Sequence, residues 1–86
     1  MSLPLCKVFG PDEDQVVFIR VQNDEGLPAV DMIYDPQVEG IANIKIGFSY
    51  DDEEDRDEVF GLLSAEAALG MRDKSRVEIQ KMFADL

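Results

Sequence analysis

The period of the hydrophobic pattern changes once along this 86-residue chain, and that change most constrains its fold. From residue 41 to residue 50, apolar side chains alternate with small or polar ones, which is typical of a half-buried β-strand. The alternating positions are Ala42, Ile44, Ile46, Phe48 and Tyr50. After Asp52 the spacing lengthens to about 3.6 residues, the period of an α-helix. The sequence therefore predicts a sheet first and helices afterwards.

Three earlier segments also have the composition of β-strands, with β-branched and aromatic side chains between turn-forming residues. With the fourth strand, the predicted strands cover residues 3–9, 16–21, 29–34 and 41–50. Glycine, proline, asparagine and acidic residues separate them at residues 10–14, 23–28 and 35–40. Connections of about six residues suit antiparallel neighbours and are too short for a parallel crossover. The chain therefore predicts a four-stranded antiparallel β-meander over residues 3–50.

Side-chain parity divides the predicted sheet into two faces. We expect the core face to carry Val17, Ile19, Val21, Val30, Met32, Tyr34, Ile44, Ile46, Phe48 and Tyr50. The other face is mixed, and Arg20 and Lys45 are expected there as cross-strand neighbours of acids. On this mixed face, Phe18, Ile33 and Ile41 are either scattered surface residues or a small apolar patch for a partner or a second copy.

Two stretches after the strands show helical spacing. Val59, Phe60, Leu63 and Ala67 form one apolar stripe, which predicts a helix over about residues 52–69 that Gly70 ends. Ser75 and Glu78 match the capping-box pattern S-x-x-E, which predicts a second helix over about residues 76–85. Its apolar stripe is Ile79, Met82, Phe83 and Leu86. The predicted fold is one α+β domain over residues 1–86, with two layers: the meander and two C-terminal helices packed on one face.

The residue types present argue against most catalytic chemistry. The chain has no histidine, the usual general base at neutral pH and the commonest zinc ligand. Its single cysteine, Cys6, lies in an apolar strand and cannot form an internal disulfide, so a reducing cytoplasm is the expected compartment. No phosphate-binding glycine motif or nucleophile elbow occurs. We expect no enzymatic activity, no cofactor and no dedicated metal site.

The net charge of −11 bears most directly on the choice of partner. Such a surface repels nucleic acids and anionic membranes, because both carry charge of the same sign. The charge is uneven along the chain. Residues 1–71 hold 16 acids and four bases, whereas residues 72–86 hold three acids and four bases. The negative field therefore belongs to the sheet and the first helix.

Seven acids follow the last strand: Asp51, Asp52, Glu53, Glu54, Asp55, Asp57 and Glu58. Acids in the first turn of a helix bond unpaired amides and complement its partial positive charge, although two or three are enough. As an EF-hand loop the run lacks the glycine at its sixth position (Arg56) and the bidentate glutamate at its twelfth (Leu62), so at most weak divalent-cation binding is expected. The third interpretation is an acidic surface that a basic protein recognises.

The surplus of acids favours a non-enzymatic binding module that presents the seven-acid run to a basic protein. A nucleic-acid-binding protein or a toxin fits, as with phosphate mimics and immunity proteins, which share this size and charge. The alternative is a structural or oligomerisation domain. In that case the outer sheet face forms a homodimer through Phe18, Ile33 and Ile41, and the acids serve solubility alone.

Overall fold

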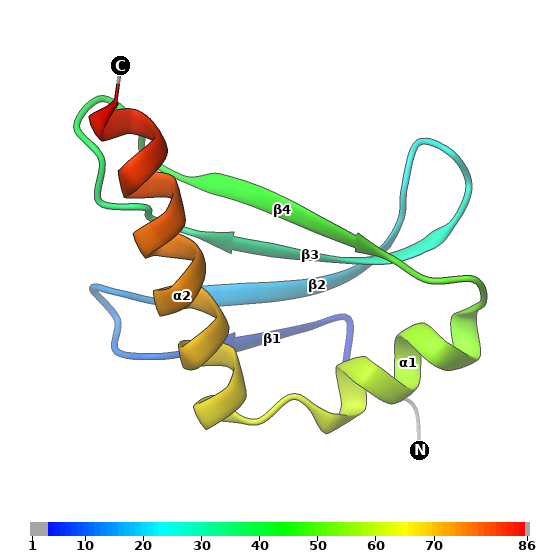
Figure 1. Cartoon of the computed structure of the whole chain (residues 1–86). Helices are drawn as coiled ribbons and strands as arrows, with labels where there is room; N and C mark the ends of the chain where they lie inside the picture. Colours follow the sequence, from blue (N-terminus) through cyan, green and yellow to red (C-terminus); the bar gives the residue numbers. More distant parts are fainter. Residues whose placement is uncertain (1–3, 86) are drawn as a thin grey trace.

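The computed structural model describes residues 4–85 and contains one four-stranded antiparallel sheet followed by two helices (Figure 1). The strands are β1 (Cys6–Phe9), β2 (Val16–Gln22), β3 (Pro28–Tyr34) and β4 (Ile44–Ser49). The helices are α1 (Glu53–Leu62) and α2 (Ala65–Ala84). Each strand pairs with its sequence neighbour in the order β1-β2-β3-β4, so the predicted α+β meander is confirmed. The predicted first-strand start at residue 3 and Leu86 of the helical stripe lie outside the described residues.

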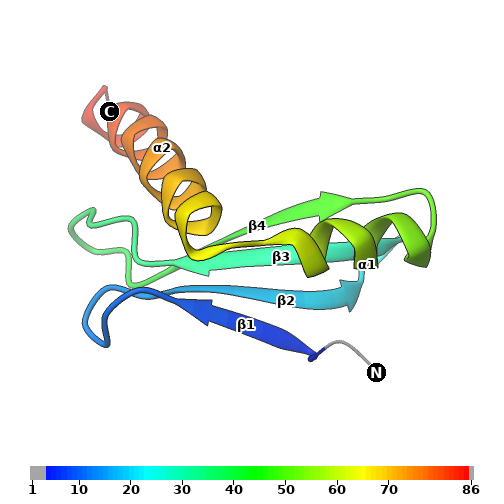
Figure 2. The same cartoon turned by 90° about the horizontal axis from the view of Figure 1, so that it is seen from below.

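Both helices pack on the same face of the sheet. Phe60 of α1 and Ala68 of α2 are fully buried in one cluster with residues of β2 and β3. Its sheet members are Val16, Phe18, Val30, Met32 and Tyr34. Figure 2 shows the sheet from the side, with α2 standing over one face and neither helix beneath the other. The second face is therefore left uncovered by the two helices, and we call it the outer face.

The register corrects the predicted parity of β2. Val16 lies opposite Tyr34 and Phe18 lies opposite Met32, so Val16 and Phe18 face the helices. Val17, Ile19 and Val21, expected in the core, lie on the outer face instead. Apolar residues occupy both the odd and the even positions of β2, so the sequence pattern alone could not show which set faces the core. The pairing with β3, whose predicted parity is confirmed, decides it.

The break between the helices also differs from the prediction. Gly70 and Ser75 lie inside α2, and the chain turns at Leu63 and Ser64 instead. Ser64 is the N-cap of α2, because its Oγ accepts the Ala67 amide at 3.2 Å. Gly70 lacks the positive φ of a C′ glycine, so it does not end the helix. Within residues 4–85, neither helix is long and apolar enough to span a membrane.

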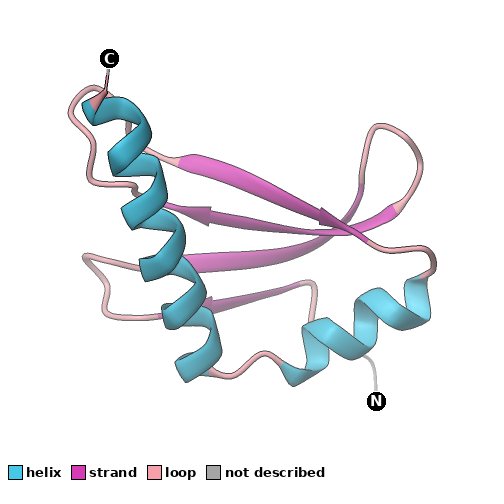
Figure 3. Ribbon diagram, in the orientation of Figure 1, coloured by secondary structure: helices cyan, strands magenta, loops and turns pink. Residues whose placement is uncertain are grey.

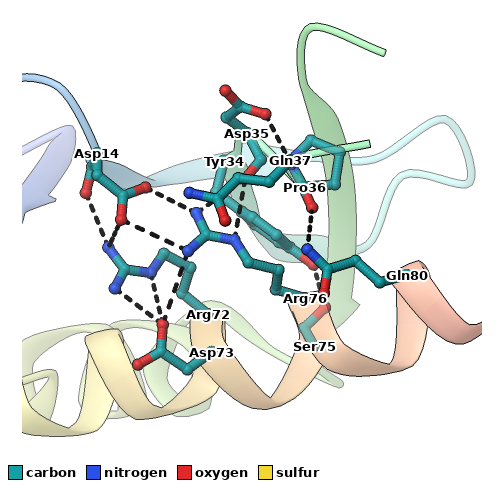
Figure 4. A network of polar contacts seen from close by, with 10 residues as sticks. All are labelled: Asp14, Tyr34, Asp35, Pro36, Gln37, Arg72, Asp73, Ser75, Arg76 and Gln80. Carbon is teal, nitrogen blue, oxygen red and sulfur yellow. Dashed lines mark hydrogen bonds and ion pairs between the residues drawn. The ribbon is translucent and has the colours of Figure 1, made fainter. Parts of the chain in front are cut away.

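Two arginines one turn apart hold α2 against the ends of the strands (Figure 4). The guanidinium of Arg76 donates to Asp14 Oδ1 at 2.7 Å and to the Asp35 carbonyl at 2.8 Å. The guanidinium of Arg72 donates to the Asp14 carbonyl at 2.8 Å and pairs with Asp73. These arginine side chains are 9% and 11% exposed, so their charges need these partners. We call this set of contacts the arginine clamp.

Further contacts extend the clamp along α2. The hydroxyls of Tyr34 and Ser75 share a hydrogen bond, and Gln80 donates to the Pro36 carbonyl at 3.1 Å. No buried side-chain nitrogen or oxygen of the described residues lacks a partner. The helix is therefore fixed mainly by polar contacts to the β1–β2 turn and to the connection after β3, with few apolar residues of its own in the core.

The clamp makes the stability of the fold depend on pH. The hydrogen bond from Arg76, reinforced by the charges of Arg76 and Arg72, holds the pKa of Asp14 below its ordinary value, although partial burial opposes the shift. A carboxyl with a lowered folded-state pKa stabilises the protein above its unfolded-state pKa. That contribution disappears as the pH falls through the folded-state pKa.

We predict that Asp14→Asn lowers the free energy of unfolding at pH 7 by about 1–3 kcal/mol, because both clamp arginines lose their shared counter-charge. Urea denaturation from about pH 6 to about pH 2 measures the effect; the wild type should lose more stability than the variant over that range. Glu13→Gln, in the same turn and exposed, is the control and should follow the wild type. Parallel pH curves for Asp14→Asn and wild type would contradict the role of Asp14.

Candidate protein-binding surface

The structure divides the seven-acid run by role. Asp52 is the N-cap of α1, and its Oδ1 accepts the Asp55 amide at 2.8 Å. Glu53, Glu54 and Asp55 occupy the first turn, where acids complement the helix dipole. One side chain, that of Asp52, thus caps the helix, in agreement with the expectation that a few acids are enough at a helix start. It leaves the other carboxylates without a capping role.

Asp57 faces the sheet and anchors α1 to β2. Its Oδ1 accepts from Arg56 Nε at 3.0 Å and from Arg20 Nη1 at 3.1 Å, and Arg56 also donates to the Val21 carbonyl. The hydrogen bond from Arg56, with a further bond from Arg20, holds the pKa of Asp57 below its ordinary value. Asp57 therefore belongs to the fold and is not part of an outward acidic surface.

The other five acids of the run are exposed, and none has a hydrogen bond or ion pair through its carboxylate among the described residues. They are Asp51, Glu53, Glu54, Asp55 and Glu58. The β2–β3 turn brings Asp24 and Glu25 to the same end of the sheet, where the Tyr50 amide donates to the Pro28 carbonyl at 2.9 Å (Figure 1). We call these seven exposed acids the acidic end.

Five of the eight basic side chains point inward, which makes the net charge of the outward side chains more negative. Lys7 donates to the Phe60 carbonyl at 2.8 Å, and its amino group lies 5.1 Å from the centre of the Phe60 ring. The four arginines are half-buried or buried and bond within the fold. The chain has 19 acids and eight bases. Five bases point inward, and their acid partners are Asp14, Asp57 and Asp73. The remaining charged residues are 16 acids and three lysines. The outward charges therefore sum to −13, more negative than the whole chain.

The outer face of the sheet is apolar at its centre. The rows Val8–Val17–Ile33 and Cys6–Ile19–Asp31 run across β1, β2 and β3. Val8 is 50% exposed, and the apolar residues of β2 and β3 in these rows are half-buried. A strand that is apolar on both faces is typical of a sheet covered on both sides, yet neither helix covers this one. The outer face, defined by Val8, Val17, Ile19, Val21 and Ile33, is thus a candidate contact surface.

The patch expected from Phe18, Ile33 and Ile41 is not formed. Phe18 is 1% exposed and lies on the core face, on the opposite side of the sheet from Ile33. Ile41 lies before β4, in an isolated bridge with Val38. Arg20, also expected outside, points to the helices. The misassigned parity of β2 is the common cause for Phe18 and Arg20.

On the core face, α2 and β4 leave an open hollow of about 310 Å³. Its lining is mainly apolar, with one lysine, one serine and one glutamate among the lining residues. The lining residues are Met32, Ile46, Phe48, Met71, Lys74, Ser75 and Glu78. The hollow exists because α1 and α2 diverge (Figure 3), so the part of the sheet beside β4 is only half covered.

Within residues 4–85, no three acids or cysteines gather in an arrangement that could hold a metal ion. Comparison of the chain with family models, curated proteins and solved structures gave no match. Its function has to be inferred from the charge and shape of its own surface.

We predict that Asp52→Ala lowers the free energy of unfolding by about 1 kcal/mol, because the Asp55 amide loses its acceptor. Asp51→Ala, one residue earlier, exposed and without a carboxylate partner, is the matched control and should stay within about 0.5 kcal/mol of wild type. Chemical denaturation of the three proteins gives both values. Equal losses for the two variants would mean that the run acts as a diffuse charge and that Asp52 has no special capping role.

Proposed function

We propose that this chain is a non-enzymatic binding protein whose acidic end engages a basic protein. The observation that carries the proposal is the inward placement of five of the eight bases, which leaves 16 outward acids against three lysines. Asp52 caps α1 and Asp57 bonds to Arg56, and the other five carboxylates of the run remain exposed. Uncompensated charge destabilises a small domain through self-repulsion, so a basic partner would relieve that repulsion.

The outer face supports a protein as the partner. A small cation would need converging ligands, whereas an apolar sheet face next to charged turns offers the apolar centre and polar rim of a protein interface. A second copy stacked on this face is the weaker alternative, because two surfaces of the same negative sign would be brought together. A basic protein satisfies both features at once.

The chemistry of the partner follows from the sign of the field. Proteins with large basic surfaces commonly bind polyanions, so a nucleic-acid-binding protein or a basic toxin is the class we propose. The chain would then act as a charge mimic or inhibitor that occupies the surface used for the polyanion. It would not bind nucleic acid or an anionic membrane itself.

We predict that a fivefold neutralised variant loses capture of the basic partner. The five substitutions are Asp51→Asn, Glu53→Gln, Glu54→Gln, Asp55→Asn and Glu58→Gln. Affinity capture from lysate at low and moderate salt, followed by identification of the retained proteins, measures the effect. Wild type should retain a basic protein that salt and added DNA displace, because ion-pair contacts are screened and DNA competes for the same surface.

The control removes five exposed acids elsewhere, so that net charge changes equally. Its substitutions are Glu13→Gln, Glu39→Gln, Glu66→Gln, Glu78→Gln and Asp85→Asn. This variant should retain the partner. Equal loss in both variants would mean that net charge alone attracts proteins. The proposal is wrong if wild type retains no basic protein in a salt-sensitive manner.

The outer face gives a separate prediction. Val17→Ser with Ile33→Ser changes two cross-strand partners and should weaken capture at every salt concentration, because the lost contact is apolar. We expect a loss of stability of about 1–2 kcal/mol, less than for a core pair, since both side chains are only half-buried. Val77→Ser, an exposed apolar residue of α2, is the control. Capture unaffected by the double change would exclude the outer face from the interface.

A further inference from the structure

Strand β4 is one edge of the sheet and pairs on one side only, with β3 (Figure 3). The Tyr50 amide donates to the Pro28 carbonyl, which shows which residues of β4 direct their backbone groups toward β3. In an antiparallel pair, alternate residues direct their backbone groups to the same side. The backbone groups of Ile44, Ile46 and Phe48 therefore point to β3. Those of Lys45, Gly47 and Ser49 point to the free edge.

This edge lacks the usual protection against pairing. Residues 44–49 contain no proline, and their register with β3 runs without a bulge over six consecutive pairs. The other edge, β1, has four residues and lies between Pro4 and Pro11. Natural sheets blunt exposed edges with short strands, prolines, bulges or charges, and β4 has only the single charge of Lys45. The free edge of β4 is therefore a template for another strand.

We propose that the strand that pairs there is β4 of a second copy, antiparallel and centred on Gly47. In this register the Gly47 residues of the two copies lie opposite each other, and Lys45 of each copy lies opposite Ser49 of the other. These are the residues whose backbone groups face outward, so every outward amide and carbonyl of the three residues gains a partner. The result is one continuous eight-stranded sheet built from two four-stranded sheets.

The same register brings complementary side chains together. On the core face, Ile46 lies opposite Phe48 of the second copy and Ile44 lies opposite its Tyr50. All four are half-buried in the single chain, and Ile46 and Phe48 line the hollow beside α2. Cross-strand pairs of aromatic and β-branched residues stabilise sheets. Pairing would therefore cover the apolar side chains that α1 and α2 leave half exposed.

Charge selects a second copy over a strand of some other protein. Lys45 is one of three outward lysines and has no acid partner among the described residues. Asp51 lies two positions beyond Ser49, in the bend between β4 and α1, and is exposed. In the antiparallel pair, Lys45 of each copy becomes the diagonal neighbour of Asp51 of the other, within reach of its long side chain. A basic strand would instead set its charges beside Lys45. This inference does not depend on the proposed basic partner.

Sedimentation of the purified chain from about 10 to about 500 μM tests the inference, because interfaces of modest area associate in this range. We expect a reversible dimer. Hydrogen exchange followed by NMR at both ends of the range should show protection of the Lys45, Gly47 and Ser49 amides that rises at least about tenfold with concentration. The amides of Ile46 and Phe48 should be protected at both concentrations. A strict monomer overturns the inference, as does a dimer that leaves the three edge amides in fast exchange.

Charge reversal supplies a second measurement. Lys45→Asp and Asp51→Lys should each weaken dimerisation at least about tenfold, because each sets like charges side by side across the pair. The two changes together should restore it. Lys81→Asp, an exposed lysine of α2, changes the net charge as Lys45→Asp does and should leave dimerisation unchanged. A double variant as weak as the singles contradicts the register. Edge protection that appears only with an added basic protein assigns the edge to that partner and overturns the second copy.

Discussion

The fold depends on cationic side chains that are held inside by acids and backbone carbonyls. A chain of 86 residues buries only a small apolar core, and α2 contributes Ala68 as its buried apolar residue. Arg72 and Arg76 attach α2 to the sheet where apolar contacts are few, through hydrogen bonds to the Asp14 carboxylate and to carbonyls at the strand ends. Because a nearly buried arginine is costly without partners, these contacts also fix the position of the helix.

The inward placement of the bases also determines the net charge of the surface. The five inward bases pair with only three acids, so the mechanism that secures α1 and α2 also makes the exterior more negative by two charges. Asp57 illustrates the division: it joins Arg20 and Arg56 beneath α1, while its neighbour Glu58 is exposed. The outward charge is therefore a consequence of how the fold is stabilised, and under the proposed function it would also attract a partner. Only the loss of capture on neutralisation separates these two origins.

The sequence was sufficient to predict the order of strands and helices and the antiparallel meander, because strands joined by short connections of turn-forming residues can be arranged in only a few topologies. It could not place β2, since Val16, Val17, Phe18 and Ile19 are apolar at both parities and the register alone resolves them. It gave a false helix start at Ser75, whose hydroxyl bonds Tyr34 across space. Ser64, followed by the helix-favouring residues Ala65–Leu69, was a readable cap. The four-residue spacing of Arg72 and Arg76 places them on one face of a helix, but it does not indicate Asp14 as their partner, because Asp14 is distant in sequence.

Under the two proposals, the outer face and the free edge of β4 would bind different partners and would not compete. Strand β4 contains no acid, and Lys45 is its one charged residue between Ile44 and Ser49. Pairing along that edge would engage one acid of each run, Asp51, and would leave Glu53, Glu54, Asp55 and the outer face free. Since the sheet continues in register through the pair, the outer faces of two copies would lie side by side. Because the pair is antiparallel, the two acidic ends would lie at opposite ends of the paired β4 strands, so each copy could engage a basic protein at its own acidic end.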